Sequence, residues 1–325
     1  MTAQSPTTTK PAETPETRPM PDVPGVSHRF VSARGTVFHV AQTGHGHGHG
    51  HGHGQGRDHG APVVLLHGLP QHWYAWRKVI PELAGDYQLF CIDLRGCGWS
   101  RGTKKGYGTK AQARDILGVL DALGLDQVRV IGHETGGWVG FELCLLAPER
   151  VSGFLALNVS HPWPSKADLI RHAWRFWYTA FWEYPGPGRT ILRRWPGFTR
   201  ALLRRWAGRA YHWDEAALEE FVEASRTRTT ARSIEQMLWQ YVLRDIPALI
   251  RPRNRRNRLT VPTLVLGGEV DPVSRLTPAL DLTRHADSLQ VEVVPGGHLL
   301  PETAPRMVAA AARLHFNDPF SEAKH

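Results

Sequence analysis

The chain has 325 residues, of which 41% are hydrophobic, and it carries a formal net charge of +9. This length fits one or two domains, and no run of about 18 apolar residues predicts a transmembrane helix. Residues 1–24 are rich in Pro, Thr and Glu and lack the apolar stretch of a secretory signal, so we expect a disordered tail. The three cysteines fit neither a disulfide framework nor a paired metal motif, which favours a reduced, cytoplasmic setting.

The first predicted element lies at residues 30–40, whose alternating pattern indicates a strand with a turn at Gly35. A low-complexity segment of His and Gly follows at residues 44–56. Glycine spacers fix no ligand geometry, so we interpret this segment as a flexible loop rather than a metal site.

From residue 62 onward, short apolar strands alternate with helices. Strands are expected at residues 63–66, 89–92, 128–131, 153–159, 263–266 and 289–294, and helices at 110–123, 135–146 and 305–316. Thr109 is expected to cap the first of these helices, and Gly124 to end it. The alternation predicts an α/β fold with a mostly parallel, doubly wound sheet.

Residues 161–258 have no strand pattern and are rich in Trp, Arg and helix formers. We interpret them as a helical lid, or cap, over the carboxyl ends of the strands, where open α/β sheets bind ligands. The core would then consist of residues 25–160 and 259–317.

Arginines cluster in this insertion, with seven between Arg189 and Arg209 and no acidic residue among them. Such runs can bind nucleic acid or an anionic membrane. No nucleic-acid-binding motif accompanies them, so we interpret them as a solvated basic surface and expect neither nucleic acid nor membrane as a partner.

The strongest motif is Val130–Gly137, which joins a predicted strand to a predicted helix. Glycines two positions before and after Glu134 match the tight strand-to-helix turn that presents a nucleophile. Glu134 would stand at the start of the helix, where the helix dipole and free amides favour a negative charge.

Two backbone N–H groups near such a turn can form an oxyanion hole. One belongs to the residue after the nucleophile, here Thr135, and the other to the residue after His67–Gly68, here Leu69. His67 itself is expected to be structural.

Two further residues complete a triad in the order nucleophile, acid, histidine. Asp271 follows the strand at 263–266, and His298 follows the strand at 289–294. An acid orients a histidine, and the histidine can activate water. Glu269 is a rival for the role of the acid.

The sequence resembles the α/β-hydrolase fold and, within it, the epoxide hydrolases, with haloalkane and haloacetate dehalogenases as relatives. The motifs that carry the resemblance are His67–Pro70, Asp93–Ser100, the Glu134 turn and Gly297–Glu302. The resemblance covers residues 25–317 and implies a catalytic triad of Glu134, Asp271 and His298.

The resemblance also implies two lid tyrosines that donate a proton to the epoxide oxygen. Tyr178 matches the position of the first, and Tyr241 is the candidate for the second. Trp177 and Trp182 are expected to shape the substrate pocket, although packing alone can explain most lid aromatics.

The chain departs from the family pattern because the usual nucleophile is aspartate and here it is Glu134. We expect an epoxide hydrolase that forms an alkyl ester on Glu134 and acts on a small apolar substrate, without cofactor or metal. The alternatives are an altered or inactive ligand-binding homologue and a dehalogenase-like hydrolase. The halide-binding side chains of haloalkane dehalogenases are missing at Leu69 and Thr135. The oligomeric state is left open.

Overall fold

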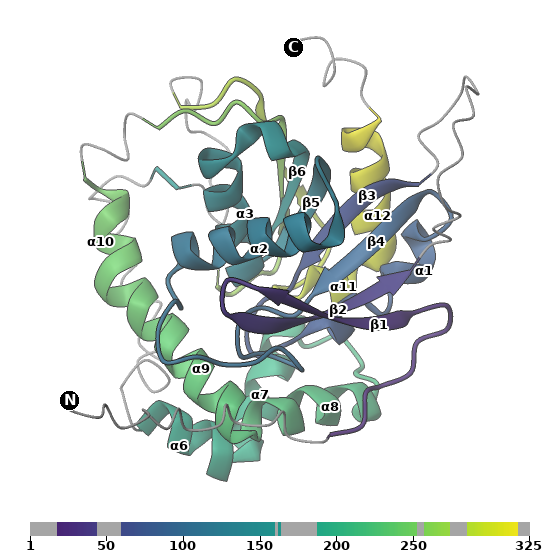
Figure 1. The fold of residues 1–325 in the computed structure, drawn as a ribbon. Coiled ribbons are helices and arrows are strands. Elements are labelled where there is room, and N and C mark those ends of the chain that lie inside the picture. The colour runs from purple at the N-terminus through teal and green to yellow at the C-terminus, as the bar shows by residue number, and fades with distance from the viewer. Residues whose placement is uncertain are drawn as a thin grey trace, which may run out of the picture.

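The computed structural model describes residues 18–43, 60–159, 162–163, 187–251, 257–273 and 285–317. Eight strands in these ranges form one sheet in the order β1-β2-β4-β3-β5-β6-β7-β8, with helices on both faces (Figure 1). Within the same ranges, no helix combines the length and the hydrophobicity needed to span a bilayer.

The first two strands form an antiparallel hairpin, β1 (Ser27–Ala33) and β2 (Thr36–Thr43). Its turn residues, Arg34 and Gly35, have φ angles of 47° and 76°. Both values are positive, as a two-residue turn that follows the twist of the strands requires. The expected turn at Gly35 is therefore confirmed. The His/Gly segment 44–56 lies outside the described residues.

The remaining strands run parallel to one another, and β4 pairs antiparallel with β2. They are β3 (Ala61–Leu66), β4 (Tyr87–Ile92), β5 (Val128–His133), β6 (Val151–Leu157), β7 (Thr263–Gly268) and β8 (Leu289–Val294). The four residues at 63–66 are fully buried. A strand covered on both faces must be apolar throughout, which explains the unbroken run.

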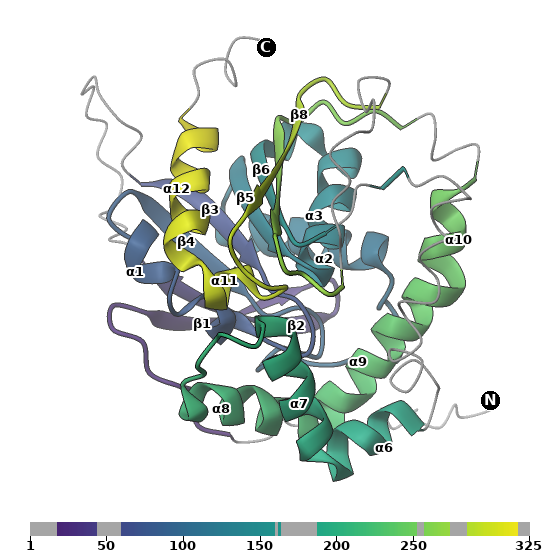
Figure 2. The same cartoon turned by 180° about the vertical axis from the view of Figure 1, so that it is seen from behind.

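Helices cover both faces of the sheet. One face carries α2 (Thr109–Leu123) and α3 (Thr135–Leu146), and the opposite face carries α1 (Ile80–Leu83), α11 (Leu300–Thr303) and α12 (Pro305–Phe316) (Figures 1 and 2). The turns η1 (Trp73–Trp76) and η2 (Pro148–Arg150) are 3-10 helical.

The start of α2 differs from the expectation. Its N-cap is Gly108, which has no side chain to accept a hydrogen bond, so the expected cap at Thr109 is wrong. The Thr109 N–H instead donates to Asp245 Oδ2 at 3.0 Å. Gly124 ends the helix as expected, in the left-handed conformation at φ 71°.

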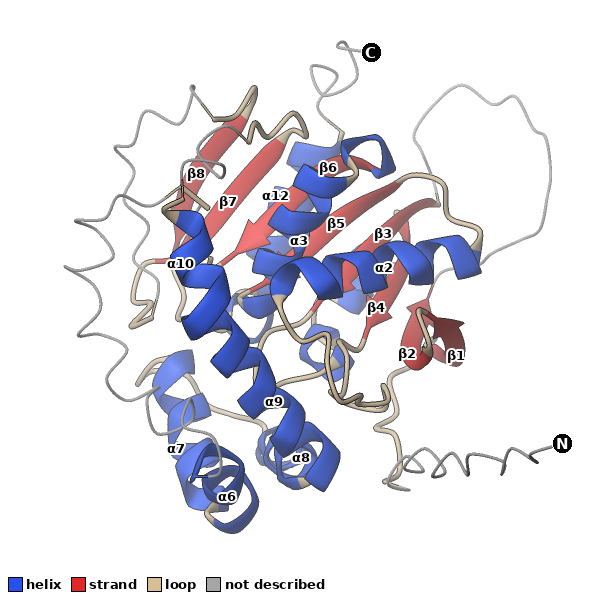
Figure 3. Ribbon diagram, turned by 60° about the vertical axis from the view of Figure 1, so that its left-hand side comes forward, coloured by secondary structure: helices blue, strands red, loops and turns tan. Residues whose placement is uncertain are grey.

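Between β6 and β7 the described chain forms the inserted helices. These are α6 (Pro187–Arg194), α7 (Pro196–Ala207), α8 (Glu215–Arg226), α9 (Arg228–Gln240), the π-helical turn η4 (Tyr241–Asp245) and α10 (Ile246–Leu249). Figure 3 shows α6, α7 and α8 beyond the carboxyl ends of the parallel strands.

Residues 18–24 contradict part of the expected disordered tail, because they pack against both the sheet domain and the inserted helices. The Arg18 guanidinium lies 4.4 Å from the Trp99 ring and 3.0 Å from Glu220 of α8. Val23 is buried.

Candidate active site

Glu134 stands between β5 and α3 in a strained backbone conformation, with φ 49° and ψ −110°. A non-glycine residue with positive φ is uncommon and costs about 1–3 kcal/mol. Close packing holds the turn in this shape. A Cβ on Gly136 would lie 2.1 Å from the Leu66 carbonyl oxygen, and one on Gly132 would lie 2.6 Å from that of Gly136. The small residues of the motif are therefore required sterically.

The two predicted oxyanion-hole amides converge on one oxygen of the Glu134 carboxylate. Oε2 accepts hydrogen bonds from the N–H of Leu69 at 2.9 Å and of Thr135 at 2.6 Å. Gly68 allows this approach, since a Cβ there would lie 3.0 Å from Oε2. Among the described residues, Oε1 has no hydrogen-bond partner. Two backbone amides thus hold one oxygen of the carboxylate, and the other oxygen has no such contact among the described residues.

His298 and Asp271 form the buried pair that the sequence predicts. His298 Nδ1 lies 2.9 Å and 3.1 Å from the two Asp271 carboxylate oxygens. A carboxylate only accepts hydrogen bonds, so Nδ1 carries a proton that it donates to Asp271. His298 Nε2 is buried and has no hydrogen-bond partner among the residues that the structure describes. The rival acid Glu269 is exposed.

Asn158, which the sequence analysis did not single out, holds the Asp271 carboxylate from the other side. Its Nδ2 donates to Asp271 Oδ2 at 2.8 Å, and the N–H of Val273 donates to Oδ1 at 2.7 Å. Asn158 directly follows β6 and has φ 49°. The sequence did show an asparagine directly after a predicted strand. Its proximity to Asp271 can be inferred only once the strand order of the sheet is known.

His133, the neighbour of Glu134, connects the two halves of the site. Its Nε2 donates to the carbonyl oxygen of His298 at 2.8 Å, and the two rings lie 5.5 Å apart. Burial, with a smaller effect of His298, lowers the pKa of His133 to about 3. His133 is therefore neutral at pH 7 and acts as a structural link between the Glu134 turn and the His298 loop.

The inserted helices border this site at two points. The Trp206 carbonyl oxygen in α7 accepts from the N–H of His298 at 2.8 Å, and its ring packs 5.2 Å from the imidazole. The ring of Tyr241 packs 5.7 Å from that of Trp138, which lies one helical turn after Glu134. Tyr241 thus contacts α3, the helix that Glu134 precedes. Tyr178, Trp177 and Trp182 lie outside the described residues.

His67 has the structural role that the sequence suggested. Its Nδ1 donates to the carbonyl oxygen of Gly68 at 3.0 Å, and its Nε2 accepts from the N–H of Leu94 at 3.0 Å. Burial lowers the pKa of His67 to about 4, so the ring is neutral. These bonds tie the loop that carries Leu69 to the loop after β4.

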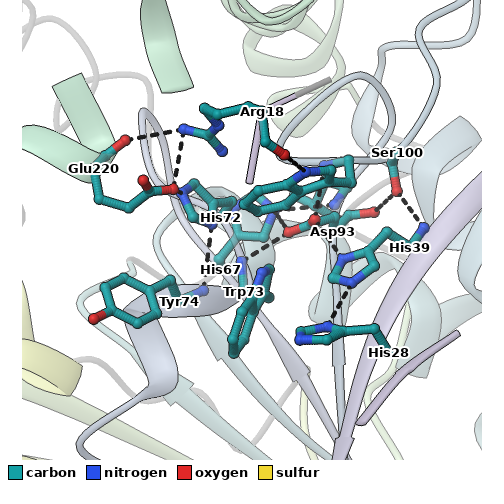
Figure 4. Close-up of polar contacts among 12 residues, drawn as sticks. Arg18, His28, His39, His67, His72, Trp73, Tyr74, Asp93, Ser100 and Glu220 are labelled. Carbon is teal, nitrogen blue, oxygen red and sulfur yellow. Dashed lines mark hydrogen bonds and ion pairs between the residues drawn. The ribbon is translucent and has the colours of Figure 1, made fainter. Parts of the chain in front are cut away.

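Asp93 strengthens the same connection (Figure 4). Its carboxylate accepts from the N–H groups of Trp73 at 2.7 Å and Trp99 at 3.0 Å, and lies 2.8 Å from His39 Nδ1. Burial, the largest single effect, would raise the pKa of Asp93, but His39, His72 and His67 together outweigh it and the pKa falls to about 2. The ionised carboxylate therefore holds the loop that carries Leu69 against the loop after β4.

The family comparison agrees with this geometry. The model of the alpha/beta hydrolase fold family matches residues 61–305. Soluble epoxide hydrolase of Corynebacterium sp. strain C12 is 28% identical over 270 residues, which cover 79% of this chain and 90% of that protein. Epoxide hydrolase B of Mycobacterium tuberculosis is 37% identical over 135 residues, which cover 41% of this chain and 35% of that protein. The match to the mycobacterial protein thus spans about a third of its length.

Solved structures show the same relationship. A Pseudomonas aeruginosa protein provisionally described as an epoxide hydrolase superposes with a TM-score of 0.74 at 27% identity, covering 91% of this chain and 96% of that one. The family match covers most of the chain and includes the Glu134 turn, Asp271 and His298. The protein is therefore an enzyme of the alpha/beta hydrolase fold family, similar in sequence and structure to epoxide hydrolases.

Proposed function

We propose that the protein hydrolyses an epoxide to a vicinal diol, with the Glu134 carboxylate as its nucleophile. The observation that best supports this function is the hydrogen bonding of Glu134 Oε2 to the amides of Leu69 and Thr135. These amides hold one carboxylate oxygen before reaction, so Oε1 is the oxygen that attacks. Relatives that are named epoxide hydrolases support the same substrate class.

In the first step, Oε1 attacks a ring carbon and the carbon–oxygen bond of the epoxide breaks. The electron pair goes to the ring oxygen, which takes a proton from the phenol of Tyr241 or Tyr178. Glu134 becomes a hydroxyalkyl ester whose carbonyl oxygen is Oε2. Because that oxygen is already bound by two amides, the ester forms with its carbonyl in the oxyanion hole.

In the second step, His298 Nε2 takes a proton from water, and the resulting hydroxide attacks the ester carbon. Leu69 and Thr135 stabilise the negative charge of the tetrahedral intermediate. When the intermediate collapses, the bond to the alkyl oxygen breaks and His298 returns its proton to that oxygen. The diol leaves. Glu134, which is now a carboxylic acid, then gives its proton to the tyrosine phenolate and becomes a carboxylate again. Asp271 keeps His298 in the required tautomer throughout.

Residues 161–258 would act as the cap of this site. Trp206 contacts His298, and Tyr241 packs against Trp138 near Glu134, so the inserted helices contribute to the wall around the reacting groups. An aromatic wall favours an apolar epoxide. In this arrangement Trp177 and Trp182 would line the pocket.

A single turnover in heavy-oxygen water tests the covalent route. After reaction with an aryl epoxide, mass spectrometry of the peptide that contains Glu134 should show one heavy oxygen in its side chain. Heavy oxygen found only in the diol would reject the covalent route, because water would then have attacked the epoxide directly.

Three variants complete this test. Glu134→Gln should abolish turnover, and His298→Ala should accumulate the ester, visible as a mass increase equal to that of the substrate. Glu269→Gln is the matched control, because Glu269 is an exposed carboxylate near the histidine loop and should keep normal turnover and labelling. Turnover in Glu134→Gln equal to that of the wild type would exclude Glu134 as the nucleophile.

A further inference from the structure

A groove with a cavity volume of about 780 Å³ lies between residues 18–19, the end of α6, the end of α8 and Thr227, which joins α8 to α9. Its polar lining consists of Arg18, Arg193, Arg194, Glu223, Arg226 and Thr227. We propose that this groove, which we call the arginine groove, binds a phosphate or diphosphate group of a small molecule. It shares no residue with the site around Glu134.

The charge of the arginine groove is strongly positive. Four arginines and one glutamate line it, so the formal charge of its lining is +4 − 1 = +3. A single carboxylate would neutralise one of these charges. A phosphate monoester carries about −1.5 to −2 at pH 7 and presents three acceptor oxygens, so a phosphate or diphosphate fits this charge better.

Two of the arginines are held in place by the protein. Arg18 pairs with Glu220 at 3.0 Å and stacks on Trp99 at 4.4 Å. Arg226 pairs with Glu223 at 2.6 Å and donates from Nε to the Arg193 carbonyl oxygen at 3.2 Å. These contacts order two of the arginine side chains that line the groove before any ligand binds, which reduces the ordering required on binding.

The other two arginines are available. Arg193 and Arg194 form the end of α6, are exposed, and have no ion pair among the described residues. Guanidinium groups form paired hydrogen bonds with phosphate oxygens. Thr227 accepts from the N–H of Thr230 at 3.1 Å, so its hydroxyl proton can be donated to a further ligand oxygen.

A simpler explanation is that the basic residues only balance the helix dipole at the end of α6. That explanation accounts for Arg193 and Arg194 but not for Arg18 and Arg226, which come from other segments and line the same groove. The cavity also lies within the roughly 300–1,000 Å³ range of small-molecule sites, so it is larger than a bare phosphate ion needs. An organic molecule that carries the phosphate would fill the rest.

Calorimetric titration of the full chain with inorganic pyrophosphate tests the proposal. We expect saturable binding at one site and a higher melting temperature, because the ligand would connect three segments of the chain. The double variant Arg193→Ala/Arg194→Ala should lose about 100-fold in affinity, since each charge-assisted hydrogen bond contributes tenfold or more.

The matched control is Arg205→Ala/Arg209→Ala. Both residues are exposed and without an ion pair among the described residues, and the change removes the same two charges outside the groove. This variant should bind pyrophosphate within about threefold of the wild type. Melting of each variant without pyrophosphate verifies that it folds.

Vesicles of phosphatidylcholine with and without phosphatidic acid distinguish the source of the phosphate. Saturable binding of pyrophosphate indicates a soluble phosphorylated molecule. Binding to phosphatidic acid vesicles alone, lost in the Arg193/Arg194 variant, assigns the phosphate to a lipid headgroup. The proposal is overturned if neither probe binds, or if both double variants weaken binding equally, because the attraction would then be a general effect of charge.

Discussion

Replacing Glu134 by aspartate tests whether the oxyanion hole is adapted to the longer acid. The change keeps the charge and removes one methylene. In the wild type, Oε2 reaches the amides of Leu69 and Thr135 at 2.9 Å and 2.6 Å. The Leu69 amide belongs to a loop that Asp93 and His67 hold in place, and the Gly136 N–H, next to Thr135, donates to the His67 carbonyl oxygen at 3.1 Å, so neither amide is free to follow a retracting carboxylate.

Shortening the side chain withdraws the carboxylate by roughly 1 Å, and a misplacement of that size costs about a hundredfold in rate. We therefore expect Glu134→Asp to form the ester about 100 times more slowly, which corresponds to about 2.7 kcal/mol in activation free energy.

The assay is a single-turnover measurement of ester formation with an aryl epoxide, alongside thermal melting to verify the fold. Glu269→Asp is the control, because it shortens an exposed carboxylate by the same methylene and should leave the rate unchanged. A Glu134→Asp rate equal to or above that of the wild type would refute the reasoning, since glutamate would then be tolerated at this position rather than fitted to it.

Four further predictions concern the support of the site and the fold. Asn158→Gly removes the donor to Asp271 Oδ2 and tolerates the φ of 49°, so kcat should fall about tenfold with KM unchanged, and a change confined to KM would contradict the positioning role. Gly136→Ala places a Cβ 2.1 Å from the Leu66 carbonyl oxygen and should greatly lower the yield of folded protein, whereas Gly85→Ala, with nothing within 4 Å of its Cβ, should fold normally in the same expression and melting assay. Arg77→Met breaks a buried ion pair with Glu302 at 2.6 Å and should lower the free energy of unfolding, measured in urea, by about 3 kcal/mol. This value is near the lower end for buried pairs because Lys78 still lies 2.7 Å from Glu302. A loss below about 1 kcal/mol would show that Lys78 fully replaces Arg77. Burial, the largest single effect, would raise the pKa of Glu302, but Arg77, Lys78 and Tyr211 together outweigh it and hold that pKa below its usual value. The wild type should therefore keep this stabilisation above about pH 4.3 and lose it as the pH falls through the lower, folded-state pKa, whereas Glu302→Gln should lack this component.

The nucleophile turn was predictable because its determinants are local. Glycines at 132 and 136 allow only one kind of connection between β5 and α3, and α3 begins and ends at the expected residues. The donors Leu69 and Thr135 and the pair Asp271–His298 followed from their positions after strand ends.

The errors and omissions all involve partners distant in the chain. Thr109 was expected to cap α2, but its N–H donates to Asp245, a residue of the insertion that lies 136 positions later in the chain. Composition suggested a disordered tail up to residue 24, and it could not predict that Arg18 contacts Trp99 and Glu220. Asn158 became visible as a support of Asp271 only through the neighbouring positions of β6 and β7.

The hydrogen bonds between the Glu134 carboxylate and the two amides also bear on substrate selectivity. A foreign ester or amide could place its carbonyl oxygen at Leu69 and Thr135 only by displacing a charged oxygen that already forms two short hydrogen bonds there. Neutral carbonyl groups accept more weakly, so this competition favours the resident group. Under the proposed mechanism, a turn that would bind an acyl group beside a serine therefore excludes it here, and the reaction takes place at a carbon centre that does not bind these amides.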